Sequence, residues 1–306
     1  MTPRSNIRYV LEYAGLRLFC AIMRLLPIAV SITIGRVLGR LCALLFKERV
    51  TLAHSNLQTA FGQQRAFSER QTIIRSLFAL LGEALVESVL CTEEEVKKNI
   101  TVEGMEHLEK ALALNKGVLM LGPHFGLWEL AGFIFGSRVP HAATVYKPLK
   151  NPLVNEYLIR ARRESGLGLI PSKNALRLVL QNLRKGAMVV ILFDQNAGRG
   201  GVPVTFFGAM ASTYPAPAVF ALKTGSPVLP AYMLKERGAR KHRLIIGEPF
   251  TLMTTGDKEK DILANTQQFN DFFEALVRQY PEQWFGWLHR RWKIPRSFAS
   301  DAEDSG

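Results

Sequence analysis

The sequence contains few cysteines, and they lie far apart. Cys20, Cys42 and Cys91 are the only three among 306 residues. This number is too small for a disulfide framework, and the spacing does not match that of a metal cluster. We therefore expect reduced thiols, as in cytosolic proteins, and a core that holds together without cross-links.

Long hydrophobic runs are also missing from the N-terminal region. The longest uncharged run within residues 1–50 is Leu25–Gly35, which includes Pro27. A helix that spans a membrane usually needs about 18 or more apolar residues in succession. No A-x-A motif stands where a signal peptidase would cleave. The sequence therefore predicts neither a conventional spanning helix nor a cleaved signal peptide.

Acidic residues are the minority among the charged ones. The chain has 26 Asp and Glu against 39 Lys and Arg, which gives a net charge of +13. Such a surface attracts nucleic acid, a phospholipid surface or a phosphorylated substrate. We find no aromatic–glycine RNA-binding signature and no helix-turn-helix pattern. Nucleic acid is therefore not the expected partner.

The positive charge gathers among apolar stretches in residues 1–50, which carry eight basic and two acidic residues. This combination predicts basic, apolar helices that lie in the cytoplasmic leaflet of a membrane. Two alternatives stay open: core helices whose arginines reach outward, or one tilted spanning helix. Residues 51–306 are then expected to form a single domain.

From Gly117 onward, short buried strands alternate with helices, which predicts an α/β fold. The strands are expected at 118–121, 188–193, 228–234 and 244–246. Helices are expected at 68–90, 127–135, from 151 onward, at 174–183, 216–224 and 262–280.

The sharpest local feature is the segment Gly122–Glu129, in which His124 follows a predicted strand. A histidine there faces a cleft at the carboxyl edge of a sheet. Glu129, one helical turn inside the next helix, could hold one ring nitrogen and leave the other as a base. No serine or cysteine stands nearby, so the base would activate a hydroxyl group of the substrate. A histidine and a glutamate at this spacing also occur by chance, and as two ligands they do not predict a metal site.

Five blocks in fixed order resemble the late acyltransferases of lipid A biosynthesis, the lauroyl- and myristoyl-transferring family. The likeness covers about residues 45–295, with one apparent extra residue (Phe285 or Gly286) before Trp287. The blocks are Asn56–Phe61, His124–Glu129, Tyr146–Pro152, Asp194–Gly208 and Pro281–Lys293.

This resemblance implies a glycerol-phosphate-acyltransferase-like mixed sheet flanked by helices. It also implies a reaction in which His124 deprotonates a hydroxyl of a lipid A precursor. That hydroxyl attacks the thioester of an acyl carrier protein, and Glu129 orients His124. The expected location is the cytoplasmic face of a bacterial inner membrane, with no cofactor apart from the acyl donor.

Substrate contacts are expected from Arg162 and Asp194. Arg163 lies opposite the apolar face of its helix, which disfavours it as a substrate contact. Alignment with the family favours Arg162 as the residue that contacts an acceptor phosphate or the thioester oxygen. Asp194 could bind the acceptor sugar or brace Arg199, or it could simply cap a loop.

Two further groups have alternative interpretations. Phe206 and Phe207 could line an acyl groove or belong to an aromatic core. The basic residues Arg290, Arg291 and Lys293 could face lipid phosphates or acyl carrier protein, or form a solvated surface.

Other functions remain open on the sequence alone. A lysophospholipid or glycolipid acyltransferase would share the histidine–acid chemistry with a different acceptor, and could use coenzyme A as carrier. A non-catalytic, basic lipid-binding protein would share the charge and the apolar N-terminal segment.

Overall fold

The computed structural model describes residues 7–90, 92–236 and 240–295. Its centre is a seven-stranded sheet in the order β1-β9-β8-β2-β5-β3-β4, and β8–β9 is its antiparallel pair. A separate hairpin is formed by β6 and β7. The strands are β1 (Ile100–Glu103), β2 (Val118–Gly122), β3 (Ala143–Tyr146), β4 (Gly168–Pro171), β5 (Met188–Leu192), β6 (Val202–Phe206), β7 (Ala209–Thr213), β8 (Val228–Lys235) and β9 (His242–Ile246).

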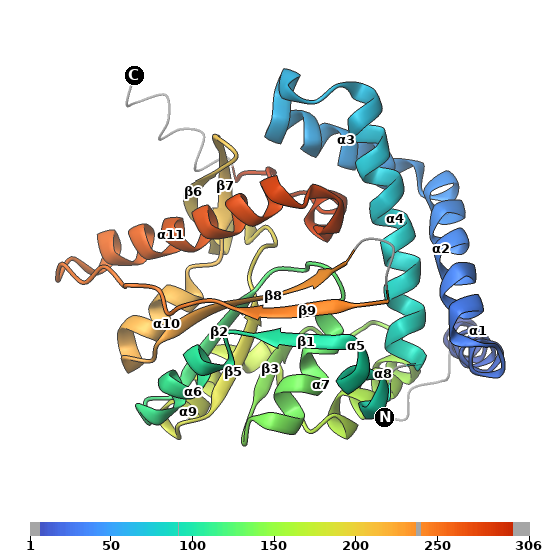
Figure 1. The fold of residues 1–306 in the computed structure, drawn as a ribbon. Coiled ribbons are helices and arrows are strands. Elements are labelled where there is room, and N and C mark those ends of the chain that lie inside the picture. The colour runs from blue at the N-terminus through green and yellow to red at the C-terminus, as the bar shows by residue number, and fades with distance from the viewer. Residues whose placement is uncertain (1–6, 91, 237–239, 296–306) are drawn as a thin grey trace.

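Helices surround this sheet, with α11 and α7 on opposite sides of it (Figure 1). The α-helices are α1 (Ile7–Leu25), α2 (Ile28–Leu45), α3 (Lys47–Phe61), α4 (Phe67–Leu90), α5 (Glu93–Asn99), α6 (Met105–Ala113), α7 (Trp128–Arg138), α8 (Pro152–Glu164), α9 (Ala175–Arg184), α10 (Ala216–Thr224) and α11 (Lys258–Gln279). The predicted mixed α/β fold is confirmed.

The central strands β2 and β5 are short runs of apolar residues, as expected of strands covered on both faces. Every residue of β2 is buried. Two of the helices around the sheet begin with side-chain caps. Asn151 caps α8 and Asp257 caps α11, each accepting hydrogen bonds from backbone N–H groups of the first turn.

Helix α4 begins slightly earlier than predicted, and its first turn is stabilised differently. Ser68 and Gln71 have the spacing of a capping box, but the helix starts at Phe67, before both of them. The Glu69 carboxylate accepts a hydrogen bond from the backbone N–H of Ala66 at 2.7 Å. The acidic residue of the first turn therefore closes this end of the helix.

Helix α2 packs closely against α4 through glycines, and the two run side by side in Figure 1. A Cβ atom at Gly39 would overlap the carbonyl of Phe78, and one at Gly82 would overlap the carbonyl of Gly35. Gly35 and Gly39 form the small-xxx-small pattern that lets helix backbones approach each other. Larger residues at these positions would force α2 away from α4.

Helix α2 is also long and apolar enough to cross a membrane, although its apolar residues are interrupted by arginines. The 18-residue stretch Ile28–Leu45 includes Arg36 and Arg40, and only 22% of it is buried. Length and composition alone do not show that it spans one, because helices of soluble proteins can share them.

Helix α1 is attached to α8. The amide of Asn151 donates hydrogen bonds to the Tyr9 carbonyl and to Glu12, each at 3.0 Å. Cys20 is a buried free thiol near the Tyr157 hydroxyl, and Cys42 is also free, while Cys91 lies outside the described residues. Both N-terminal helices therefore pack against the rest of the chain on one side and expose apolar residues on the other.

Candidate active site

Sheet register brings His124 and Asp194 together from positions 70 residues apart. Strands β2 and β5 are parallel neighbours, and their last residues, Gly122 and Leu192, pair in register. His124 and Asp194 each lie two residues beyond these ends. Both side chains therefore reach the same point on the carboxyl edge of the sheet, where ligands of α/β proteins commonly bind.

The two side chains form a short hydrogen bond. His124 Nδ1 lies 2.7 Å from Asp194 Oδ1. Because a carboxylate can only accept, Nδ1 carries the proton and donates it. The other ring nitrogen, Nε2, has no hydrogen-bond partner among the described residues. The His124 side chain is 21% exposed, so this nitrogen is available to accept a proton from a substrate.

Asp194 is buried and receives two more hydrogen bonds. The backbone N–H of His124 donates to Oδ2 at 2.9 Å, and the indole N–H of Trp284 donates to the same atom at 2.7 Å. From the sequence, Asp194 could bind the acceptor sugar, brace Arg199 or cap a loop. Its hydrogen bond from the His124 backbone agrees with the loop cap, and no hydrogen bond joins it to Arg199 among the described residues. With three internal donors, the buried carboxylate lies against the His124 ring.

The pKa values of the pair move apart. Burial disfavours a charged His124 ring, but the charge and hydrogen bond of Asp194, with help from Glu129, outweigh it and raise the pKa of His124. Burial alone would raise the pKa of Asp194, but His124 and the Trp284 indole lower it. An ionised Asp194 thus stabilises the charged form of His124, an arrangement that is also typical of a general base and its partner.

Glu129 does not make the predicted hydrogen bond to His124. The prediction placed Glu129 one turn inside a helix from Leu127, and α7 does begin close to this, at Trp128, but Gly126 before it has a positive φ of 55°. This turn directs Glu129 toward α8, where Arg162 Nη2 and Nε donate to its two oxygens at 2.6 and 3.1 Å. The ring partner of His124 is therefore Asp194, and Glu129 acts on His124 through charge alone.

A strap of 3-10 turns after α11, residues Pro281–Leu288, holds the His124 loop in place. The backbone N–H of Gly126 donates to the Gln283 carbonyl, and that of Phe285 donates to the His124 carbonyl, both at 2.9 Å. Trp284 stands between these two contacts and reaches Asp194. Pro281–Lys293 is one of the five blocks that resemble the family, but its contacts with the His124 loop were not predicted from the sequence.

The remaining predicted residues divide into buried and exposed ones. Phe206 and Phe207 are buried in an aromatic cluster with Trp284, Trp287 and Trp292, which supports the core interpretation.

Arg291 is buried as well. Its guanidinium lies over the Phe206 ring and donates to Thr213 and to the Ser212 carbonyl. Burial lowers the pKa of Arg291 to about 10, which leaves it charged at neutral pH. Arg290 and Lys293 are exposed.

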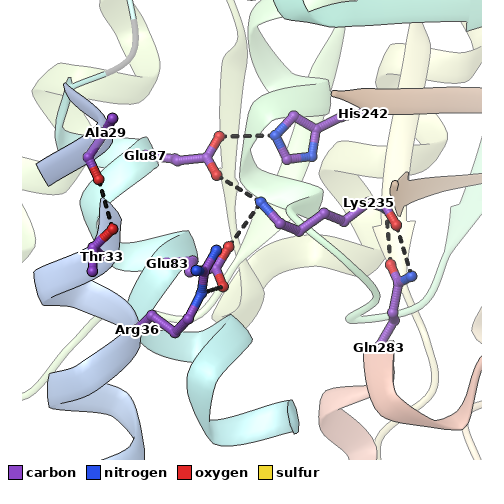
Figure 2. Close-up of polar contacts among 8 residues, drawn as sticks. All are labelled: Ala29, Thr33, Arg36, Glu83, Glu87, Lys235, His242 and Gln283. Carbon is purple, nitrogen blue, oxygen red and sulfur yellow. Dashed lines mark hydrogen bonds and ion pairs between the residues drawn. The ribbon is translucent and has the colours of Figure 1, made fainter. Parts of the chain in front are cut away.

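A second buried cluster of charges lies between α2, α4 and the β8–β9 pair (Figure 2). Arg36 Nε contacts Glu83 at 2.7 Å, and Lys235 Nζ contacts Glu83 and Glu87 at 2.9 and 3.0 Å. His242 Nε2 lies 2.8 Å from Glu87 Oε2. This cluster attaches the N-terminal helices to the sheet.

Figure 2 also shows that the cluster connects to the strap. The side chain of Gln283 accepts from the Lys235 backbone N–H at 2.8 Å and donates to the Lys235 carbonyl at 2.9 Å. Gln283 directly precedes Trp284, so the strap is fixed to the end of β8 beside the His124 loop.

These features agree with a comparison to known proteins. Residues 2–294 match the family model described as "Bacterial lipid A biosynthesis acyltransferase". The chain belongs to this family. It is 30% identical over 291 residues to the lipid A biosynthesis palmitoleoyltransferase of Escherichia coli (strain K12), covering 94% of this chain and 92% of that protein.

Other lipid A acyltransferase relatives extend over similar lengths. The lipid A biosynthesis lauroyltransferase of Escherichia coli (strain K12) is 27% identical, covering 95% of this chain and 94% of that protein. A phosphatidylinositol mannoside acyltransferase of Mycobacterium tuberculosis (strain CDC 1551 / Oshkosh) is 28% identical over 60% of this chain and 57% of its own length. The function that this family membership supports is therefore acyl transfer in lipid A biosynthesis.

Proposed function

We propose that this acyltransferase moves a fatty acyl chain from an acyl carrier protein thioester to a hydroxyl of a lipid A precursor. The central support is the His124–Asp194 pair at the carboxyl edge of the sheet. In this proposal His124 is the general base, and the donor and acceptor are substrates, so no cofactor is needed. The core then has the glycerol-phosphate-acyltransferase type of fold.

The reaction proceeds through proton transfer and acyl exchange. Nε2 of His124 takes the proton of the acceptor hydroxyl while its oxygen attacks the thioester carbonyl carbon. The tetrahedral intermediate collapses, the carbon–sulfur bond breaks, and His124 returns the proton to the leaving thiolate. The products are an ester and the free thiol of the carrier. General-base catalysis of this kind contributes about 10²–10⁴-fold.

Asp194 holds the His124 ring in the tautomer that leaves Nε2 free and stabilises the imidazolium that forms. Glu129 and Arg162 act together at the edge of the site. Their two-point ion pair fixes the guanidinium against Glu129, whose charge acts on His124, and in this proposal the guanidinium contacts the thioester oxygen or an acceptor phosphate. Glu129 then contributes by positioning Arg162.

We also propose that α1 and α2 bind the cytoplasmic face of the bacterial inner membrane. Their outer surface carries large, exposed apolar side chains, among them Leu11, Leu18, Leu25, Leu41 and Leu45. Arginines are interspersed with these residues, and each basic side chain at an anionic surface contributes about 1 kcal/mol. This arrangement would bring the His124 site close to a lipid acceptor.

The test uses detergent-solubilised protein with acyl carrier protein donors of several chain lengths. The acceptors are a lipid A precursor and a lysophospholipid, and His124→Ala and Asp194→Asn are assayed beside the unmodified protein. We expect acylation of the lipid A precursor, strongly reduced in both variants. Transfer only to the lysophospholipid would keep the mechanism and reject the acceptor. Membrane binding without transfer to either would favour a lipid-binding protein.

A further inference from the structure

A hollow of about 190 Å³ lies beside the His124–Asp194 pair and has no part in the proton transfer described above. We call it the Asn196 hollow. Gln195 and Asn196 line it on one side, and His289, Arg290 and Lys293 line it on the other. Gln195 directly follows Asp194, so the lining of the hollow begins at the residue next to the one whose carboxylate holds His124.

The charges that act on His289, which lines the hollow, agree with this placement. Partial burial lowers the pKa of His289, and the positive charges of His124 and Arg49 lower it further, while Asp194 opposes them. These groups therefore lie within range of one another's charge. A ligand in the hollow would be held close to the base.

The hollow has an excess of positive charge. None of its five lining residues is acidic, and neither Arg290 nor Lys293 forms an ion pair with a carboxylate of residues 7–90, 92–236 or 240–295. Arginines elsewhere differ, since Arg162 and Arg243 each have a glutamate partner. Unpaired cations around a concave surface attract an anion.

The backbone that carries these cations is fixed on both sides. The Asn196 amide donates to the carbonyls of Arg290, Arg291 and Lys293 at 3.0, 3.0 and 2.7 Å. Between them, the buried Arg291 side chain binds Thr213 and the Ser212 carbonyl. The turn is thus organised before a ligand binds, which reduces the entropic cost of binding.

Size and charge together indicate the ligand. Pockets for a whole drug-sized molecule begin at about 300 Å³, so this hollow suits one group of a larger molecule. Two cationic side chains match a phosphate monoester, which carries about −1.5 to −2 charges at pH 7. A carboxylate would balance only one of them. Arginine also offers the two-point geometry that phosphate oxygens accept.

We propose that the Asn196 hollow binds a phosphate monoester of the acceptor lipid while the acceptor hydroxyl lies at His124. This inference rests on the proposed function, because it assigns the phosphate to the acceptor of that reaction. Arg290 and Lys293 are then residues that determine acceptor specificity, and they take no part in the chemical step.

The test removes the two charges and compares a matched pair. The double variant Arg290→Gln/Lys293→Gln neutralises the hollow. The control double variant Arg184→Gln/Lys185→Gln removes the same charge from exposed positions just before β5, whereas the hollow lies beyond the other end of this strand. We expect the first pair to raise the KM for the phosphorylated acceptor at least about tenfold, because charge-assisted hydrogen bonds are lost. Its kcat and the KM for the donor should stay unchanged. The control pair should behave like the unmodified protein.

Two outcomes of this assay would overturn the inference. An equal rise in KM for both pairs would mean general attraction of an anionic lipid. A rise in KM for the donor alone would assign the hollow to the phosphodiester of the carrier arm or to the carrier's acidic surface. Enzymatic removal of the acceptor phosphate should abolish the difference between the unmodified protein and the Arg290/Lys293 variant.

A second measurement does not depend on turnover. Acetylation of Lys293 by acetic anhydride, followed by mass spectrometry, should slow in inorganic phosphate relative to chloride at equal ionic strength, while Lys185 reacts unchanged. Equal protection of both lysines, or of neither, would reject the site even if acyl transfer is confirmed. Protection of Lys293 in a protein that acylates no lipid would keep the phosphate site and reject the proposed function.

Discussion

Within the described residues, two histidine–carboxylate pairs with short hydrogen bonds have surroundings that give them different roles. His124–Asp194 and His242–Glu87 have almost the same separation, 2.7 and 2.8 Å. The His124 side chain is 21% exposed, whereas His242 is 1% exposed and its Nδ1 is buried without a hydrogen-bond partner among the described residues. A substrate can reach only the first ring.

The partners of the two carboxylates differ as well. Asp194 is bonded to neutral donors besides His124, namely an indole and a backbone N–H. Glu87 also contacts the ammonium group of Lys235. Burial opposes ionisation of Glu87, but His242 and Lys235 outweigh it and lower its pKa. His124 is thus the only ionisable hydrogen-bond partner of Asp194 among the described residues, whereas Glu87 is part of a network of ion pairs.

Removal of the accessible ring should have the largest effect on activity. We expect His124→Ala to reduce kcat about 10²–10⁴-fold, since the general base is lost. His242→Ala should leave the kcat of the folded fraction unchanged. Initial rates, with the amount of folded protein determined by circular dichroism, separate the two. Equal losses of kcat would contradict the distinction between the pairs.

Removal of the network carboxylate should mainly affect stability. Glu87→Ala leaves Lys235 and His242 without their shared partner, which costs about 3–5 kcal/mol when a buried ion pair is broken. Thermal unfolding in detergent measures this change. Glu87→Gln, which keeps the shape and one acceptor oxygen, should lose less, and a Tm equal to that of Glu87→Ala would argue against the electrostatic explanation.

Trp284 offers a way to alter the first pair without removing it. Trp284→Phe deletes the indole donor to Asp194, so the carboxylate charge acts more fully on His124 and raises its pKa further. In the unmodified protein, we expect kcat/KM to rise with pH. The midpoint of this rise should lie above the usual histidine pKa of about 6.5. The midpoint should be higher again in the variant, with a loss of about tenfold in kcat at neutral pH.

Trp287→Phe is the matched control for this experiment. Trp287 is equally buried in the same aromatic cluster, but its indole donates to the Pro281 carbonyl. Its replacement should leave the midpoint of the pH profile in place. A parallel shift in both variants would mean that the aromatic packing, and not the indole hydrogen bond, sets the pKa of His124.

Arg36 should give the smallest effect. Its side chain is 40% exposed, so solvent screens its contact with Glu83. We expect Arg36→Gln to cost about 1 kcal/mol or less in the free energy of unfolding and to leave kcat unchanged. A loss as large as that of Glu87→Ala would show that the whole network acts as one unit.

The sequence predicted the strands and helices near the site because their signals are local. The apolar runs of β2 and β5 and the Asn-Pro start of α8 each depend on a few neighbouring residues. The hairpin β6–β7 was not predicted, since Pro203 and the glycines around it interrupt any alternating pattern.

The partner of His124 could not be derived in the same way. Proximity in sequence favoured Glu129, but the positive φ at Gly126 redirects the chain. Asp194 depends on the register that pairs Gly122 with Leu192, and Trp284 depends on the strap returning from α11. These are relations between distant segments, and only the tertiary structure supplies them.

The glycine contact between α2 and α4 limits how the protein can be shortened for study. A chain that begins at Lys47 would expose to water the strip of α4 around Gly82 and the buried Val86, and Glu83 would lose Arg36. Such a strip fits another small-residue helix, so truncated chains should aggregate through it. Soluble preparations are better sought by replacing the outward-facing leucines of α1 and α2 with polar residues, which leaves the contact intact.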